Sequence, residues 1–228
     1  MVVHGSLPRS SDVVFIQCMA IWESLLASQV TLGVERNIGS VNQGPKWSPP
    51  RSGRLKLNCD ASVVNGGEQV GIGVVVRGCS GDLRVAVGER CYGRLSPLAA
   101  ELQAIIMGLE LMLERRWVPD GVEIDCLEAV RLVNGDEQAF AFAHDGVLVE
   151  RVRQLLSSLG LHGISHIPRG ANGVAHAVAT RVARLDGRRM WLGVGPDWLM
   201  DVIFGDRPVT YVSNQEASGA YVPTTGSS

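Results

Sequence analysis

Three strand patterns follow one another between residues 54 and 90, and this run limits the possible folds more than any other feature. The segment 54–62 (RLKLNCDAS) alternates apolar and polar residues, and 70–78 (VGIGVVVRG) is almost entirely apolar. The third segment, 82–90 (DLRVAVGER), follows after a turn of hairpin length. The sequence therefore predicts a sheet that opens with three antiparallel strands.

Helix and strand patterns alternate after these three strands. The segment 96–117 is the strongest helix pattern in the chain, with Ser96 as a suitable N-cap and Pro97 in the first turn. A strand that passes into a helix, a second helix, a short strand and a final helix follow it. Their predicted ranges are 122–135, 145–160, 163–168 and 171–187. The order β-β-β-α-β-α-α-β-α predicts an α/β fold with a mixed sheet.

The sequence divides into three predicted segments. Residues 1–45 combine a helical pattern at 12–30 with a linker rich in glycine, proline, serine and asparagine. Residues 46–187 form the compact domain. Residues 188–228 form a C-terminal tail that becomes polar, and by prediction disordered, from about residue 214.

Composition indicates a globular protein and excludes some partners. The chain has 228 residues, 46% hydrophobic and 19% charged, which suits one core of roughly 150 residues with attached segments. The net charge of −2 and the pI of about 6.2 exclude a strong non-specific grip on nucleic acid through bulk charge. A local basic groove remains compatible with them.

Cysteine usage and hydropathy favour an intracellular protein. The five cysteines are odd in number and lack C-x-x-C spacing, so neither a zinc ribbon nor a disulfide framework is indicated. A reducing compartment, nucleus or cytoplasm, is the simpler interpretation. The longest N-terminal apolar stretch, VVFIQCMAIW at 13–22, is too short to cross a membrane and lacks a clear cleavage site. We therefore expect no membrane partner.

Three carboxylates each have an ordinary explanation. Asp60 lies mid-strand and fits an outward-facing polar residue. Glu101, on the first turn of the helix, fits an interaction with the helix dipole, and Asp125, between strand and helix, fits an N-cap. The C-terminal end of a strand is also where α/β proteins place reactive groups. Taken singly, none of the three establishes a function.

Taken together, the three carboxylates predict a metal site. The strand-centre aspartate, the helix glutamate and the strand-end aspartate can converge on one edge of a sheet. Converged carboxylates repel one another, and a hard divalent cation such as Mg²⁺ relieves that repulsion. Two such ions about 4 Å apart can activate a water and stabilise the leaving oxygen of a phosphodiester.

Four short motifs occur in an order that resembles the ribonuclease H family. They are KWSPPRSGRLKLNCDAS, LAAELQAI, IDCLEAV and SHIPRGANGVAHAVA. They look most like the plant branch of RNase H-like domains derived from non-LTR retrotransposons, and the tail GPDWLMDVIFGD resembles the ending of that branch. The resemblance covers residues 46–206. It implies an RNase H-like fold with a five-stranded mixed sheet, three strands antiparallel and two parallel, flanked by helices.

The resemblance also implies a reaction, hydrolysis of the RNA strand of an RNA–DNA hybrid with two Mg²⁺ or Mn²⁺ ions. Asp60 matches the carboxylate that bridges both ions, and Glu101 and Asp125 match those that hold the second ion. His166 matches a mobile histidine near the scissile phosphate. A titratable imidazole suits proton handling there near neutral pH.

Several residues are predicted to bind the nucleic acid. Asn172 matches an asparagine beside the final metal ligand of the family, and Arg169 is expected to contact phosphate. We also predict substrate contacts for Asn58 and Ser62. The glycines of NGGEQVGIG, residues 65–73, would let the backbone approach a substrate read through its A-form shape and 2′-hydroxyls. The expected partner is the hybrid itself; the sequence names no protein partner.

Two further arginines have two interpretations. Arg181 and Arg184 lie within the last helix pattern and would supply phosphate contacts or form a solvated helix face. The sequence does not choose between them.

His176 departs from the pattern of bacterial and retroviral relatives, which carry an aspartate there on the first-metal side. The plant branch often shows histidine. A neutral imidazole adds no negative charge, and Mg²⁺ matches a nitrogen ligand poorly, whereas Mn²⁺ tolerates one better. We therefore predict weaker binding of the first metal and a preference for Mn²⁺. The alternative is a packed helix histidine without a metal contact.

Three other functions compete with an active RNase H. The first is a weakened RNase H-like domain that binds nucleic acid or another partner without cutting. The second is a plain interaction domain in which the carboxylates are caps and surface residues. The third is another nuclease on the same fold, such as a resolvase or exonuclease, although the sequence lacks their signatures.

Overall fold

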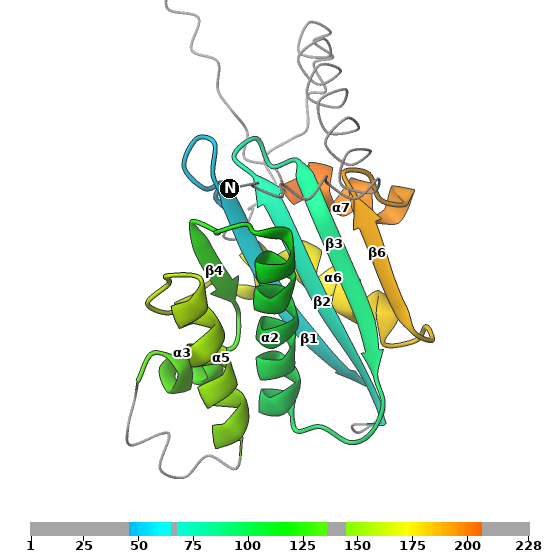
Figure 1. Ribbon diagram of the computed structural model, residues 1–228. Coiled ribbons are helices and arrows are strands. Elements are labelled where there is room, and N and C mark those ends of the chain that lie inside the picture. Colours follow the sequence, from blue (N-terminus) through cyan, green and yellow to red (C-terminus); the bar gives the residue numbers. More distant parts are fainter. Residues whose placement is uncertain (1–45, 65–67, 136–144, 207–228) are drawn as a thin grey trace, which may run out of the picture.

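A computed structural model describes residues 46–64, 68–135 and 145–206, and within these ranges the strands form one mixed sheet. The order across the sheet is β5-β4-β1-β2-β3-β6 (Figure 1). The strands are β1 (Leu55–Val64), β2 (Gln69–Gly78), β3 (Leu83–Cys91), β4 (Gly121–Ile124), β5 (Ser165–His166) and β6 (Arg188–Leu192).

Strand directions confirm the predicted α/β architecture, with one correction. Strands β1, β2 and β3 are antiparallel, whereas β4 runs parallel to β1 and β5 parallel to β4. The predicted five-stranded sheet is wrong by one strand, because β6 pairs antiparallel with β3. Strand β6 is an edge strand in which four of five residues are exposed. It therefore lacks the apolar alternation that marks a half-buried strand.

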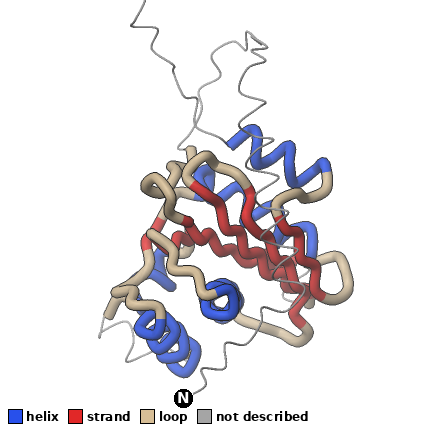
Figure 2. The backbone as a smooth tube through the Cα atoms, turned by 45° about the horizontal axis from the view of Figure 1, so that its top comes forward, coloured by secondary structure: helices blue, strands red, loops and turns tan. Residues whose placement is uncertain are grey.

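Helices cover both faces of the sheet (Figure 2). Helix α2 packs on one face together with α3 and α5, and α6 packs on the other face together with α7. The helices are α2 (Pro97–Arg115), α3 (Leu127–Val133), α5 (Gly146–Ser158), α6 (Gly173–Val182) and α7 (Asp197–Asp206), and a 3₁₀ turn (Arg169–Asn172) precedes α6. Across the described ranges, none of these helices has the length and apolar character of a membrane span.

Helix α2 begins and ends as its sequence predicts. The Ser96 hydroxyl accepts a hydrogen bond of 2.9 Å from the Ala99 N–H, and Pro97 occupies the first turn. Arg116 ends the helix in the left-handed region, with φ of 57°. The predicted helix at 12–30, its linker and the polar tail from residue 214 lie outside the described residues.

Two glycines of β2 determine how closely α6 approaches the sheet. A Cβ atom on Gly73 would lie 2.4 Å from the Ala175 carbonyl oxygen, and one on Gly71 would lie 2.1 Å from that of Ala179. Both glycines therefore face the backbone of α6, which corrects the prediction that they approach nucleic acid. The preceding glycines of the same motif, at 66 and 67, lie outside the described residues.

A buried aromatic ring links the start of the predicted domain to the segment predicted as the C-terminal tail. The guanidinium of Arg77 stacks on the Trp47 ring, with Cζ 3.7 Å from the ring centroid. The same guanidinium donates from Nη1 to Asp206 Oδ2 at 2.8 Å. Trp47 belongs to the KWSPP motif and Asp206 to the tail motif. Each motif thus supplies one residue that holds Arg77 in place.

The close approach of α6 predicts a strong effect of Gly73→Ala. The added methyl group would overlap helix backbone, and overpacking of this kind costs about 1–3 kcal/mol or more of the free energy of unfolding. Denaturant unfolding followed by circular dichroism measures the change. Gly121→Ala is the matched control, because its Cβ would meet nothing within 4 Å. Equal stability of the two variants would contradict this packing.

Candidate metal centre

Three secondary-structure elements bring the predicted carboxylates together. Asp60 comes from β1, Glu101 from α2, and Asp125 directly follows β4. Strand β1 pairs with β4 only at residues 56–58, so Asp60 lies on the part of β1 that extends past the end of β4. One oxygen from each carboxylate lies within 4.8 Å of the others. The predicted convergence is therefore confirmed.

The ordinary explanations for the single carboxylates do not hold. Asp60 is only 1% exposed, so it is not an outward-facing strand residue. Glu101 lies beyond the first turn of α2, where its favourable interaction with the helix dipole is small. Helix α3 takes Cys126 as its N-cap residue, so Asp125 is not its cap. None of the three carboxylates therefore acts as a surface residue, a partner of the helix dipole or a helix cap.

A backbone hydrogen bond fixes Glu101 against β1. Its Oε2 accepts from the Ala61 N–H at 3.1 Å, at a point past the described pairing of β1 with β4. The side chain of the helix residue therefore satisfies a strand N–H and is aimed at Asp60.

Mutual repulsion and burial raise the pKa values of the cluster. Burial, followed by the charges of Asp60 and Asp125, raises the pKa of Glu101 from 4.5 to about 9. Burial also raises the pKa of Asp60 from 3.8 to about 6; Asp125 adds to this shift, whereas His176 opposes it. Without a cation the cluster therefore binds protons near neutral pH. A divalent cation, with its preference for carboxylate oxygens, suits this donor set.

Asn172 joins the strand to the cluster. Its Nδ2 donates to the Cys59 carbonyl at 2.8 Å and to Asp125 Oδ1 at 3.2 Å. The side chain is fully buried, and its Oδ1 has no hydrogen-bond partner among the described residues. Asn172 thus positions Asp125 from within, a placement that does not suit the predicted contact with substrate.

His176 stands at the open side of the cluster. Its Nδ1 lies 2.9 Å from Asp60 Oδ2, and its side chain is 34% exposed. The imidazole is therefore not packed into the core, and its contact with a metal stays a prediction. The imidazole contacts Asp60 alone of the three carboxylates and lies outside the group whose ligand atoms are all mutually close.

Arg169 covers the imidazole. Its Nη2 lies 3.1 Å from Nδ1 and 3.3 Å from Nε2 of His176. An atom nearly equidistant from both nitrogens lies over the ring face, because in the ring plane it would overlap Cε1. The guanidinium is 68% exposed, and its Nη1 lies 4.0 Å from Asp125 Oδ2. Arg169 therefore places an accessible positive charge beside the carboxylates, as a phosphate contact requires.

The remaining predicted residues have different placements. His166 is exposed on β5, opposite Ile124 in the register with β4, and forms no hydrogen bond or ion pair with a described residue. Ser62 lies on β1, with its Oγ 3.4 Å from Thr180 Oγ1. Asn58 is buried; it accepts from Trp47 Nε1 and donates to Glu123 Oε2. That placement does not suit substrate binding, and Asn58 is a structural residue.

One residue of the site escaped the sequence analysis. Thr180 lies on α6 with its Oγ1 3.5 Å from His176 Nε2. Residues four apart on a helix are neighbours. The spacing of four residues between His176 and Thr180 would therefore have predicted this contact from the sequence.

The chain belongs to the reverse transcriptase-like family, whose model matches residues 58–182, more than half of its length. The matched range includes the three carboxylates, Asn172 and His176. No curated protein matches the chain.

Several solved structures are similar in fold. The N-terminal RNase H domain of a Mycobacterium tuberculosis protein, solved as a fusion with maltose-binding protein, is 19% identical, with a TM-score of 0.49, covering 57% of this chain and 92% of that one. RNase H1 of the halophilic archaeon Halobacterium salinarum is 23% identical, with a TM-score of 0.45, covering 57% and 97%. LC11-RNase H1 in complex with an RNA/DNA hybrid is 21% identical, with a TM-score of 0.46, covering 57% and 96%.

The raised pKa of Glu101 predicts how stability changes with pH in the metal-free protein. The folded state holds its proton up to about pH 9, whereas the unfolded chain releases it near 4.5, so the free energy of unfolding falls as pH rises between these values. Glu101→Gln should remove more than about 1 kcal/mol of this fall. Denaturant unfolding with a chelator, from pH 5 to pH 9, measures it. The exposed Glu150→Gln is the control; an equal fall in wild type and Glu101→Gln would contradict the account.

Proposed function

We propose that this chain is a metal-dependent endonuclease of the RNase H type, which hydrolyses the RNA strand of RNA–DNA hybrids. One observation carries the proposal: carboxylates from β1, α2 and the end of β4 meet in a partly buried cluster, with one oxygen of each within 4.8 Å of the others. Membership of the reverse transcriptase-like family and the four RNase H-like motifs support it.

Asp60, Glu101 and Asp125 would hold Mg²⁺ or Mn²⁺, two ions by analogy with the family. Their all-oxygen donor set and raised pKa values fit a hard divalent cation, whose charge would offset the repulsion among the carboxylates. When bound, such ions supply an activated water and stabilise the leaving oxygen of a phosphodiester.

The chain's own side chains orient the substrate and the cluster. Asn172 holds Asp125 in place through its hydrogen bond, and Arg169 offers its exposed guanidinium to a phosphate oxygen beside the carboxylates. His166, exposed at the end of β5, is assigned proton transfer near the scissile phosphate. Ser62 lies on the same strand as Asp60 and is assigned a contact with the nucleic acid.

His176 affects the charge and the metal preference that we propose for the site. Its imidazole contacts Asp60, and Arg169 stacks over its ring. A neutral ligand at this position gives less negative charge for the first metal than an aspartate would, and it favours Mn²⁺ over Mg²⁺. A weakened domain that binds nucleic acid without cutting is the second candidate, because the same substitution lowers metal affinity.

On the motif resemblance, we also propose that the protein derives from the plant branch of non-LTR retrotransposon domains. We propose an intracellular location, in the nucleus or the cytoplasm. The compact domain predicted at residues 46–187 extends further, because β6 pairs with β3 and α7 packs on α6.

The purified full chain should cleave the RNA strand of a labelled RNA–DNA hybrid in the presence of Mg²⁺ or Mn²⁺. Asp60→Asn should lower the rate at least about 100-fold, because it removes a charged ligand from the cluster. Asp201→Asn, an exposed aspartate on α7, is the matched control. Binding without cleavage by the wild type would instead support the weakened domain, and neither binding nor cleavage would support an interaction domain.

His176→Asp tests the role of the imidazole. The variant should cleave the hybrid faster in Mg²⁺, by about tenfold, and lose the preference for Mn²⁺, because a carboxylate suits both ions. Cleavage rates of both proteins in both metals measure this. Equal rates of the wild type in the two metals, with no gain from the variant in either, would contradict the assignment.

A further inference from the structure

A hollow of about 430 Å³ adjoins the candidate metal centre. It lies between the outward face of α6 and the side chain of Trp198 on α7. His176 stands at one end, where the hollow meets the carboxylate cluster. Its lining includes His176, Ala177, Thr180, Arg181, Arg184 and Trp198.

Helical spacing makes most of this hollow a continuous track. His176 and Thr180 lie four residues apart on α6, and Ala177 and Arg181 form the row beside them. Arg184 lies just past the helix, which ends at Val182. From His176 to that end the track extends about 9 Å, at a rise of about 1.5 Å per residue. One strand of a duplex advances about 3.4 Å along the axis per phosphate. The track is therefore longer than one nucleotide step and leads away from the site of the chemistry.

The track carries positive charge that no carboxylate of the described residues neutralises. Arg181 and Arg184 are both exposed, and neither forms an ion pair within the described ranges. By contrast, Arg90 pairs with Asp186 nearby on the same face of the molecule. In a chain with a net charge of −2, two such arginines beside an acidic cluster indicate an anionic ligand.

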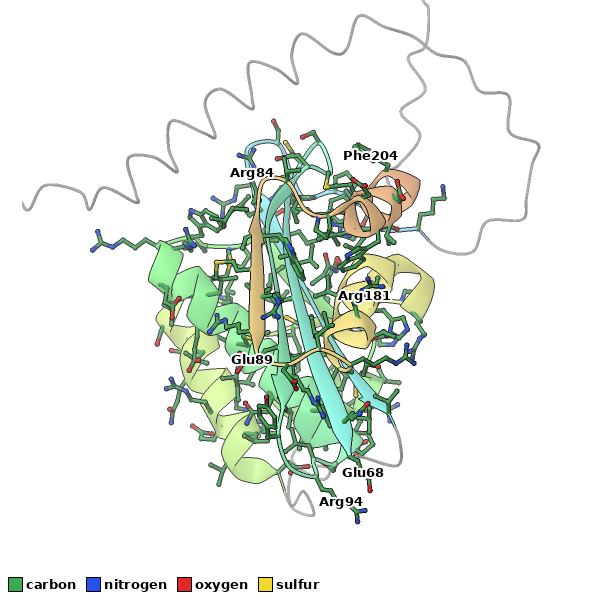
Figure 3. The ribbon with its side chains drawn as sticks, turned by 90° about the vertical axis from the view of Figure 1, so that its right-hand side faces the viewer. Glu68, Arg84, Glu89, Arg94, Arg181 and Phe204 are labelled. Atoms are coloured by element: carbon green, nitrogen blue, oxygen red, sulfur yellow. The ribbon has the colours of Figure 1, made fainter. Side chains whose placement is uncertain are left out.

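Arg181 lies on α6, which packs beside α7 (Figure 3), and its guanidinium is near an aromatic ring of α7. Its Cζ lies 5.6 Å from the centroid of the Trp198 ring. Trp198 is in turn held by an edge-to-face contact with Trp191, with ring centroids 5.8 Å apart. The distance from Arg181 to Trp198 fits a cation–π attraction, which uses none of the N–H groups of Arg181, so they stay able to donate hydrogen bonds to phosphate.

We propose that this track is a phosphate subsite for the nucleic-acid strand on one side of the scissile bond. Arg181 and Arg184 contact backbone phosphate oxygens, and the Thr180 hydroxyl donates at the end nearest the metal centre. These contacts are charge-based and carry no base preference. The inference rests on the proposed function, because it gives the track the same ligand as the active site.

The test compares Arg181→Ala/Arg184→Ala with Arg131→Ala in the full chain. Arg131 is exposed in the last turn of α3, on the opposite face of the sheet, so the control removes a charge away from the track. The double variant should raise KM for an RNA–DNA hybrid about tenfold or more, the loss expected for charge-assisted hydrogen bonds, and leave kcat unchanged. Arg181→Lys/Arg184→Lys should restore most of the affinity.

A second measurement separates this proposal from the proposed function. Hybrid binding is followed by fluorescence anisotropy at several salt concentrations, on the Asp60→Asn background so that no cleavage occurs. Loss of two phosphate contacts should reduce the slope of log affinity against log salt by roughly 1.5. Reduced binding by the double variant without any wild-type cleavage would overturn the nuclease and support the subsite. Wild-type cleavage with KM and salt slope equal in all variants would overturn the subsite alone.

Discussion

The contact between the backbone of α6 and the glycines of β2 is the constraint on which the candidate site depends. Gly73 pairs with Asp60 across the first two strands, so the point of closest helix approach is also the position of the central carboxylate. A side chain on Gly73 would push α6 outward, and His176 would move away from Asp60. The packing of α6 on β2 thus positions both the apolar core and the acidic site. A substitution that disturbs this packing therefore affects both.

A second constraint is electrostatic and opposes folding of the empty site. Three carboxylates with oxygens within 4.8 Å of one another disfavour their charged forms, and burial together with these charges raises the pKa of Glu101 to about 9. Such a cluster costs stability wherever it is charged. The cluster lies near the end of β4, where the buried Asn172 holds Asp125 and the exposed Arg169 lies on the open side. This placement suits the binding of a cation and an anionic substrate.

Much of this arrangement follows from the sequence. The three strands, the capped helix α2 and the late helix carry strong periodic signals, and the sequence also predicts the convergence of the three carboxylates. The sixth strand was missed because an exposed edge leaves no alternation to detect. The prediction that the glycines of β2 approach nucleic acid was wrong, because they face α6. A glycine pattern indicates a close approach but does not identify the approaching group.

The roles of polar side chains were the hardest to predict. Asn58 and Asp60 are two residues apart on β1, yet only Asp60 reaches the cluster. Asn58 instead forms hydrogen bonds with Trp47 and Glu123. Spacing places both residues on one face; their partners come from distant segments and cannot be read from it. The stacking of Arg169 over His176 is likewise a contact across a 3₁₀ turn that no short motif specifies.

Direct measurement of metal binding tests the central claim, that the three carboxylates form one divalent-metal site. Mn²⁺ binding to the full chain at neutral pH can be followed by electron paramagnetic resonance of the free ion. The account predicts that the wild type binds Mn²⁺ and that Glu101→Gln and Asp125→Asn each lower the affinity at least about tenfold, whereas the exposed Glu150→Gln does not. Equal Mn²⁺ binding by the wild type and both cluster variants would contradict it.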